Sequence, residues 1–423
     1  MTETLELKHI SLVHMPDIIS MKKVSFRFFN SGTMKRYLLF GLILFVSSLQ
    51  AQKFEELAKT PPMGWNSWNK FACDINEKTI KEIADAMVNS GLRDAGYQYL
   101  VIDDCWQVRR DSSGTIIADP DRFPSGMKSL GDYIHSKGLR FGIYSDAGTA
   151  TCQGRPGSRG YEFQDARTYA SWGVDYLKYD WCNHGKQNCE AAYITMRDAL
   201  YQAGRPVVFS ICEWGVNKPW EWASGIGHLW RSTEDIINCF DCKNYWGGQG
   251  VVQIIDLFTE IGTFTGPGHW NDADMLEIGN GALTPSEERL HISMWSMFSS
   301  PLMAGNDLRT MSKETISILT NREVLAIDQD KLGISAIRWM KYDDLEIWFK
   351  PLEWGNYAFC FINRGNQPVT IDQDIKTSIR KYIIDDSYMI RDLWKHENTG
   401  STKENIKRSL PAHDVLMIKL IKR

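Results

Sequence analysis

The sequence predicts an α/β fold, a (β/α)8 TIM barrel followed by a small C-terminal antiparallel β-sandwich domain. Two observations lead to this prediction. Between residues 52 and 332, a short apolar run, a polar or acidic tip and a helix-like stretch recur along the chain. After residue 332, short strand-like runs continue with no long helical pattern between them. A doubly wound sheet would need a glycine-rich phosphate turn after its first strand, and GxGxxG is absent there.

Eight barrel strands are expected, each ending in a loop at the catalytic mouth. They are residues 61–68, 99–106, 140–146, 174–179, 206–214, 228–236, 268–275 and 297–304. Helices are expected at residues 77–90, 124–137 and 165–172, and Gly91 and Gly138 end the first two. Strands of the sandwich are expected at residues 345–349, 357–362 and 415–420, with a turn at residues 363–368.

The first 51 residues are interpreted as a leader. Lys35 and Arg36 precede an apolar run at residues 37–46, and small residues then precede a cut after Ala51, which is the pattern of a signal peptide. The apolar run is too short to span a membrane, and residues 1–33 look like an upstream translation start. The expected domains are therefore 1–51 (upstream extension and signal peptide), 52–332 (barrel) and 333–423 (β domain). We expect an exported protein, periplasmic or secreted, without a membrane anchor.

Composition narrows the range of partners. The net charge of −4 gives no electrostatic reason to expect a nucleic acid. The many Trp and Tyr residues supply core area in any fold, but near strand ends they also suit sugar binding, because pyranose C–H faces stack on indole rings.

Export permits disulfides among the nine cysteines, and Cys239 with Cys242 forms a local disulfide or free thiols more readily than a zinc site. The sequence does not decide whether the protein forms a homo-oligomer.

The central strand carries Lys178 and Asp180, two residues apart, so both side chains point to the same face. A cation beside a carboxylate keeps it ionised at neutral pH, as a carboxylate nucleophile must be. The alternative is a buried ion pair that only closes the barrel, and this segment alone does not decide between the two.

Acidic residues gather at the predicted strand tips, which a barrel brings to one mouth. They are Asp103, Asp104, Asp180, Glu213, Asp235, Asp272 and Asp274. Crowded carboxylates suit glycoside hydrolysis, which needs one ionised and one protonated carboxyl group. A divalent metal site is the rival interpretation, but the mouth offers only His184 and His269 as nearby imidazoles. We therefore expect neither a metal nor another cofactor.

Between residues 60 and 332 the sequence resembles the family-27 glycoside hydrolases, the α-galactosidases or melibiases. The motifs that carry the resemblance stand in the family's order and are TPPMGWNSWN, YQYLVIDDCWQ, DPDRFPSGMKSL, IHSKGLRFGIYSDAG, WGVDYLKYDWCN, SICEWG, WRSTEDI and GHWNDADML, then NDLR and IDQD. The resemblance implies a (β/α)8 barrel with an antiparallel β domain, and a retaining exo-acting α-galactosidase.

The same resemblance implies residue roles. Asp180 resembles the nucleophile and Asp235 the general acid/base, with Glu234 as a bystander. Their alternatives are an ion-pair member for Asp180 and a helix-start acid for Asp235. Retention implies carboxyl groups about 5–5.5 Å apart.

Substrate contacts are implied in the same way. Asp103 and Asp104 would accept hydrogen bonds from the galactose 4- and 6-hydroxyls, and Lys178 and Arg231 would donate to ring hydroxyls. The remaining implied contacts are Asp274 toward the 2-hydroxyl, Trp68 as a wall, Trp65 as floor support, and Glu213, which favours a plain 2-hydroxyl over an acetamido group.

The implied disulfides are Cys73–Cys105 and Cys152–Cys182, whereas Cys212 faces Gly227 at the position of a further bridge in some members. The expected substrates are melibiose-, raffinose- or galactomannan-type ends. The alternatives are a β-L-arabinopyranosidase, an α-N-acetylgalactosaminidase or, in another class, a non-catalytic sugar-binding barrel.

Overall fold

The computed structural model describes residues 53–375 and 387–422. The predicted signal peptide therefore lies outside the described residues. Within these ranges, no helix combines the length and apolar character needed to cross a membrane.

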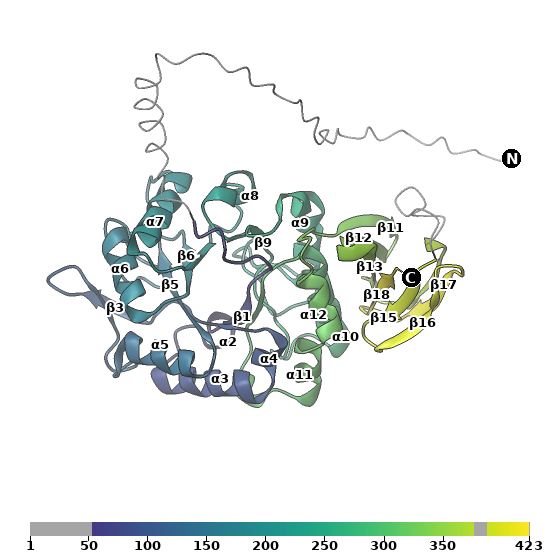
Figure 1. Cartoon of the computed structure of the whole chain (residues 1–423), viewed down its shortest axis with the longest axis horizontal. Helices are drawn as coiled ribbons and strands as arrows, with labels where there is room; N and C mark the ends of the chain where they lie inside the picture. The colour runs from purple at the N-terminus through teal and green to yellow at the C-terminus, as the bar shows by residue number, and fades with distance from the viewer. Residues whose placement is uncertain (1–52, 376–386, 423) are drawn as a thin grey trace, which may run out of the picture. The chain divides into compact units, whose positions relative to one another are not determined.

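The predicted fold class is confirmed (Figure 1). The barrel strands are β1 (Met63–Asn66), β2 (Tyr99–Ile102), β5 (Arg140–Asp146), β6 (Tyr176–Asp180), β7 (Val208–Ile211), β8 (Leu229–Arg231), β9 (Trp270–Asp272) and β10 (Leu302–Ala304). All neighbouring pairs in the order β10-β1-β2-β5-β6-β7-β8-β9 are parallel. A parallel bridge between Leu276 and Ala304 joins the segment after β9 to β10 and closes the ring.

The barrel helices lie outside the strands (Figure 1). They are α2 (Trp68–Phe71), α3 (Glu77–Asn89), α4 (Leu92–Ala95), α5 (Gly126–Ser136), α6 (Glu162–Trp172), α7 (Cys189–Ala203), α8 (Pro219–Trp222), α9 (Val251–Ile261), α10 (Pro285–Phe298), α11 (Lys313–Leu319) and α12 (Arg322–Asp328). A hairpin, β3 (Gln107–Arg110) with β4 (Ile116–Ala118), follows β2 and was not predicted.

The predicted eighth strand, residues 297–304, was wrong in its first half. Met297 and Phe298 end α10, and the strand itself starts only at Leu302. A capping box between Thr284 and Glu287 starts this helix, and its buried apolar face continues to Phe298. A buried helix and a buried strand are equally apolar, so hydrophobicity did not separate them.

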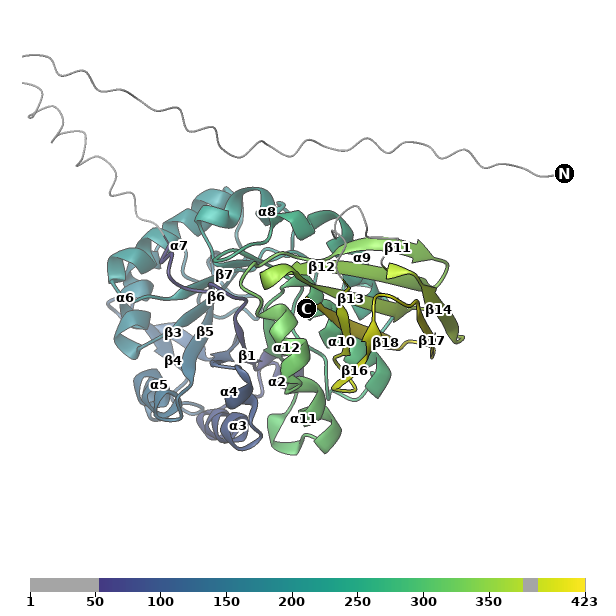
Figure 2. The same ribbon diagram turned by 45° about the vertical axis from the view of Figure 1, so that its right-hand side comes forward.

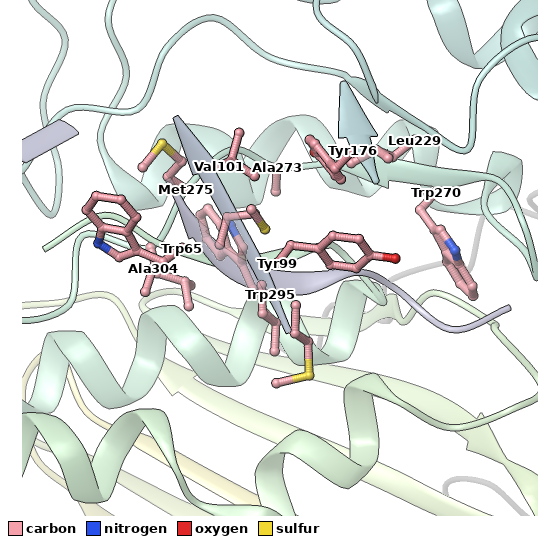
Figure 3. Close-up of a cluster of buried hydrophobic side chains, with 14 of the residues drawn as sticks. Trp65, Tyr99, Val101, Tyr176, Leu229, Trp270, Ala273, Met275, Trp295 and Ala304 are labelled. Carbon is pink, nitrogen blue, oxygen red and sulfur yellow. The ribbon is translucent and has the colours of Figure 1, made fainter. Parts of the chain in front are cut away.

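Large side chains form a buried cluster around the barrel strands (Figure 3). Trp65 on β1, Trp270 on β9 and Trp295 on α10 are fully buried, and Tyr99 and Tyr176 are buried with them. Each indole N–H has a partner; that of Trp65, for example, donates to the carbonyl of Asn306 at 2.8 Å. Inside the ring of strands, Tyr99 and Tyr176 pack with their ring centroids 5.4 Å apart, which fills the barrel below its mouth.

The C-terminal β domain contains a six-stranded antiparallel sheet in the order β11-β12-β13-β18-β15-β16, with the pair β14–β17 beside it (Figure 2). Its strands are β11 (Ile337–Tyr342), β12 (Leu345–Leu352), β13 (Asn356–Asn363), β14 (Val369–Gln373), β15 (Met389–Asp392), β16 (Glu397–Ser401), β17 (Ile406–Leu410) and β18 (Val415–Ile421). The second hydrophobic cluster, which includes Ile347, Phe359 and Ile371, joins the sheet to the pair. The barrel meets this domain where α10 packs on β12, β13 and β18.

Candidate active site

A cavity of about 490 Å³ opens at the carboxyl ends of the barrel strands. Carboxylates, three cations (Lys70, Lys178 and Arg231) and aromatic rings line it together. Its lining includes Trp68, Asp103, Asp104, Tyr144, Cys152, Lys178, Asp180, Trp214, Arg231, Asp235, Trp246, Asp274, Met275, Glu277 and Asn280. All but one of the residues expected from the sequence to bind or cleave the sugar are therefore brought to one place.

Asp180 ends β6 and is 5% exposed. The Tyr144 hydroxyl donates to its Oδ2 at 2.9 Å, and the Trp181 backbone N–H donates to its Oδ1 at 3.0 Å. Burial raises the pKa of Asp180 to about 6, although the nearby charge of Lys178 opposes the rise. Above that pH, Asp180 is an ionised, oriented carboxylate in a site largely closed to water.

Lys178 does not form the expected contact with Asp180. Its ammonium pairs with Asp103 Oδ2 at 2.8 Å, and the Asn66 side-chain amide donates to the same oxygen at 2.7 Å. Asp103 follows β2, which β5 separates from β6, so the Lys178 side chain reaches across the barrel mouth instead of along its own strand. The cation acts on Asp180 only through its field.

Asp104 lies beside Asp103 and is almost fully buried. The backbone N–H groups of Cys105 and Gln153 donate to its carboxylate at 2.6 and 3.0 Å. Burial raises the pKa of Asp104, and these hydrogen bonds counteract part of the rise. Asp103 and Asp104 thus offer fixed acceptor oxygens at the same side of the cavity.

Asp235 follows β8, and 43% of its side-chain surface is exposed. Arg231 reaches Asp235 at 2.6 Å and Asp274 at 2.7 Å, and the Ile236 N–H also donates to Asp274 at 2.6 Å. Burial is the largest single influence and acts to raise the pKa of Asp235, but the charges of Arg231 and Lys178 and the hydrogen bond from Arg231 together outweigh it and hold the pKa below its ordinary value. The guanidinium thus couples two carboxylates from different strands.

Glu213 is the one expected sugar contact that the cavity lining does not include. It is fully buried, and its Oε2 accepts hydrogen bonds from the backbone and side chain of Asn217. Burial raises its pKa to about 7. Trp214, whose φ of 56° is left-handed, lines the cavity instead. The hydrogen bonds from Asn217 hold the Glu213 carboxylate outside the cavity lining.

Several lining residues were not assigned a role from the sequence, among them Tyr144, Met275 and Trp246. Tyr144 stands within the motif at residues 134–148, so the signal for it was present. Met275 directly follows Asp274, and Trp246 belongs to a segment that had no interpretation.

Three disulfides are present in the described residues: Cys73–Cys105, Cys152–Cys182 and Cys239–Cys242. Cys212 is buried and unpaired. One group of potential metal ligands, Asp146 and Asp180 with Cys152 and Cys182, lies at the site. Its two sulfurs are joined to each other, so neither is a thiolate ligand.

Comparison with known proteins gives consistent matches. Residues 60–330 match the family model "Alpha galactosidase A", and residues 342–420 match "Alpha galactosidase C-terminal beta sandwich domain". The chain is 53% identical to an α-galactosidase A of Cellvibrio japonicus over 407 residues, covering 92% of this chain and 100% of the relative. It is 45% identical to α-galactosidase 2 of Arabidopsis thaliana, covering 87% of this chain and 91% of the relative.

Among solved structures, α-galactosidase I of Mortierella vinacea superposes with a TM-score of 0.83 at 38% identity, covering 87% of this chain and 98% of that chain. A β-L-arabinopyranosidase of Geobacillus stearothermophilus gives 0.74 at 26% identity, covering 86% and 97%.

Proposed function

The chain belongs to the family of melibiases, is an α-galactosidase and retains the anomeric configuration, and from this premise we propose which residues carry the reaction. Asp180 is the nucleophile and Asp235 the general acid/base for terminal α-linked galactose. The observation that carries the proposal is the contrast between two carboxylates of one cavity. Asp180 is buried and held by Tyr144, whereas Asp235 is half exposed beside the entrance.

In the first step an Asp180 oxygen bonds to the anomeric carbon while the glycosidic C–O bond breaks. The proton of Asp235 passes to the leaving oxygen, so the leaving group departs as a neutral alcohol. In the second step Asp235 takes a proton from water, and the water oxygen displaces Asp180 from the anomeric carbon. Two inversions give net retention.

Arg231 controls whether Asp235 holds this proton. In the free enzyme its charge keeps Asp235 ionised, which is the wrong state for a proton donor. A sugar hydroxyl that accepts from Arg231 weakens the ion pair, so the pKa of Asp235 rises as the substrate binds. Binding thereby favours the protonated form when it is needed.

The sugar-binding part of the proposal concerns the opposite side of the cavity. The paired acceptors Asp103 and Asp104, together with Lys178, suit the 4- and 6-hydroxyls of a hexose. Asp274 faces the 2-hydroxyl beside Arg231, and Trp68 supplies the wall. The substrates are non-reducing galactose ends of melibiose-, raffinose- or galactomannan-type saccharides. The leader pattern and the disulfides support an exported, periplasmic or secreted enzyme.

A β-L-arabinopyranosidase is the second candidate, because a solved structure with that activity shares the fold. Hydrolysis of the para-nitrophenyl α-galactoside, β-L-arabinopyranoside and α-N-acetylgalactosaminide, with and without EDTA, separates these specificities. An EDTA-insensitive preference for the galactoside is expected. Preference for another sugar would overturn the specificity, and loss of activity with EDTA would overturn the metal-free mechanism.

Azide rescue tests the two roles separately. In Asp180→Gly, azide enters where the carboxylate stood and displaces an activated aryl leaving group once, so β-galactosyl azide is expected. In Asp235→Gly, azide attacks the galactosyl-enzyme without needing a base, so α-galactosyl azide is expected. NMR identifies the anomers. The opposite pattern, or no azide adduct from either variant, would overturn the assignment.

A further inference from the structure

The segment between β8 and α9 forms a closed loop that returns to Asp235. The Gln249 N–H donates to the Asp235 carbonyl at 2.9 Å, and the Ile237 N–H donates to the Gln249 carbonyl at 2.9 Å. The Cys239–Cys242 disulfide lies within the loop, and the Cys242 N–H donates to the Gln253 side chain at 3.1 Å. Residues 237–249, which we call the return loop, are therefore fixed to the backbone of the proton donor.

Trp246 lies at the tip of the return loop and lines the catalytic cavity. The Asn244 side chain accepts from the Gly248 N–H at 2.7 Å, and the Asn244 N–H donates to the Gly248 carbonyl at 3.1 Å, which closes a tight turn around the indole. A Cβ on Gly248 would lie 2.5 Å from the Trp246 Cη2 atom, so the indole rests directly on this glycine. Nevertheless, 51% of the Trp246 surface is exposed.

An indole that is packed at one edge and still half exposed beside a catalytic cavity presents a large apolar surface to a ligand. Its neighbour Tyr245 is 99% exposed and does not line the cavity. Only one of the two adjacent aromatic residues is therefore directed toward the site.

The position of Trp246 relative to the chemistry identifies what it contacts. Asp235 gives its proton to the leaving oxygen, so the leaving group lies on the Asp235 side of the cavity. The acceptors for galactose, Asp103 and Asp104, follow β2, whereas Trp246 shares its loop with Asp235. Trp246 therefore faces the leaving group and not the galactose.

The cavity is larger than the galactose alone requires. A water molecule occupies roughly 30 Å³ in the liquid. If each of the twelve non-hydrogen atoms of a hexose took that much space, the sugar would need about 360 Å³. The cavity holds about 490 Å³, and Trp246 lines it while half of its surface stays exposed. Asn238, which also lines it, donates to the carbonyl of Asn280 at 3.0 Å and thus ties the return loop to the segment after β9.

We infer that Trp246 is the platform of a leaving-group subsite, on which the C–H face of a pyranose stacks, so that the enzyme prefers galactose linked to a further sugar. This inference rests on the proposed role of Asp235. Trp246 is a specificity residue and not a catalytic one, because it contacts neither the anomeric carbon nor the proton that Asp235 transfers.

The test compares two substrates that differ only in the leaving group. Melibiose carries a glucose unit, whereas α-galactosyl fluoride carries a single atom that cannot stack and departs without a proton. We expect Trp246→Ala to lower kcat/KM for melibiose about tenfold, equivalent to about 1.4 kcal/mol, with the fluoride rate within twofold of the native enzyme. Trp246→Phe keeps an aromatic face and restores most of the melibiose rate.

Tyr245→Ala is the matched control, since it removes an adjacent aromatic ring that lies outside the cavity, and it leaves both rates unchanged. A fall in kcat for the fluoride as large as the loss on melibiose in Trp246→Ala would mean that the loop only positions Asp235, because that residue is still needed as the base when water attacks the galactosyl-enzyme. No loss on either substrate would also overturn the subsite. A native chain inactive on both substrates would refute the proposed function instead.

Discussion

The Tyr144 hydroxyl is predicted to set the acidic limit of activity. Tyr144→Phe removes its hydrogen bond to Asp180 but keeps the buried ring, which lies 5.4 Å from the Lys178 ammonium. A hydrogen bond to a charged group contributes about 1.5–3 kcal/mol, and about 1.4 kcal/mol corresponds to one pKa unit. Because the bond favours the ionised carboxylate, its loss raises the pKa of Asp180 by about one to two units from its value of about 6.

The assay is kcat/KM for an aryl α-galactoside as a function of pH, which reports the groups of the free enzyme. Well below pH 6 the variant falls roughly ten- to hundredfold behind the native enzyme. At high pH, where Asp180 is ionised in both, the ratio of the two rates returns toward one. Tyr97→Phe is the control, since it removes a buried hydroxyl that donates to Leu319 at 2.9 Å. An unshifted acidic limb in Tyr144→Phe would refute the reasoning.

Two further predictions concern stability. Lys350 is fully buried and donates to the Ser296 and Ile327 carbonyls and the Ser299 hydroxyl at 2.7–2.8 Å, so Lys350→Met should lower the free energy of unfolding by about 2–4 kcal/mol. Denaturant titration measures the free energy of unfolding of both variants. The control Lys341→Met changes a half-exposed lysine and should cost under about 1 kcal/mol. An equal loss in the two variants would contradict the prediction. Removing Cys152–Cys182 as a double alanine variant should cost roughly 3–4 kcal/mol, because the bridge spans 30 residues. Removing Cys239–Cys242, which spans only three residues, should cost less stability. A larger loss from removing Cys239–Cys242 than from removing Cys152–Cys182 would exclude loop closure as the cause.

Periodicity predicted most of the barrel, because each unit repeats a buried strand and an amphipathic helix. It missed strands that are polar or partly exposed, such as β16, whose sequence is Glu-Asn-Thr-Gly-Ser, and the hairpin β3–β4. Edge strands bury only part of one face, so they lack the alternation from which strands are inferred. The family motifs, in contrast, located the carboxylates of the cavity regardless of how regular the elements were.

Orientation could not be inferred in the same way. Glu213 and Trp214 are adjacent, yet only Trp214 lines the cavity, while Glu213 is held by Asn217 four residues further along the chain. The partner of Lys178 depends on how strands β2 and β6 are spaced across the barrel, since a third strand lies between them. The residue that lines the cavity and the partner of Lys178 both depend on tertiary geometry, which cannot be inferred from a linear pattern of residue types.

The corrected partner of Lys178 explains how the site reconciles charge with reactivity. The two buried cations of the cavity pair with carboxylates that we assign to binding or proton transfer: Lys178 with Asp103, and Arg231 with Asp235 and Asp274. In the described part of the chain, Asp180 has no direct ion pair and accepts only neutral hydrogen bonds from Tyr144 and Trp181. A carboxylate bound tightly to a cation is a weaker nucleophile, because its electron pair is already engaged. Hydrogen bonds from a phenol and a backbone amide orient Asp180 without that loss, while the field of Lys178 limits how far burial raises its pKa. Because the other carboxylates of the site take the cations as partners, the Asp180 carboxylate stays available to attack the anomeric carbon.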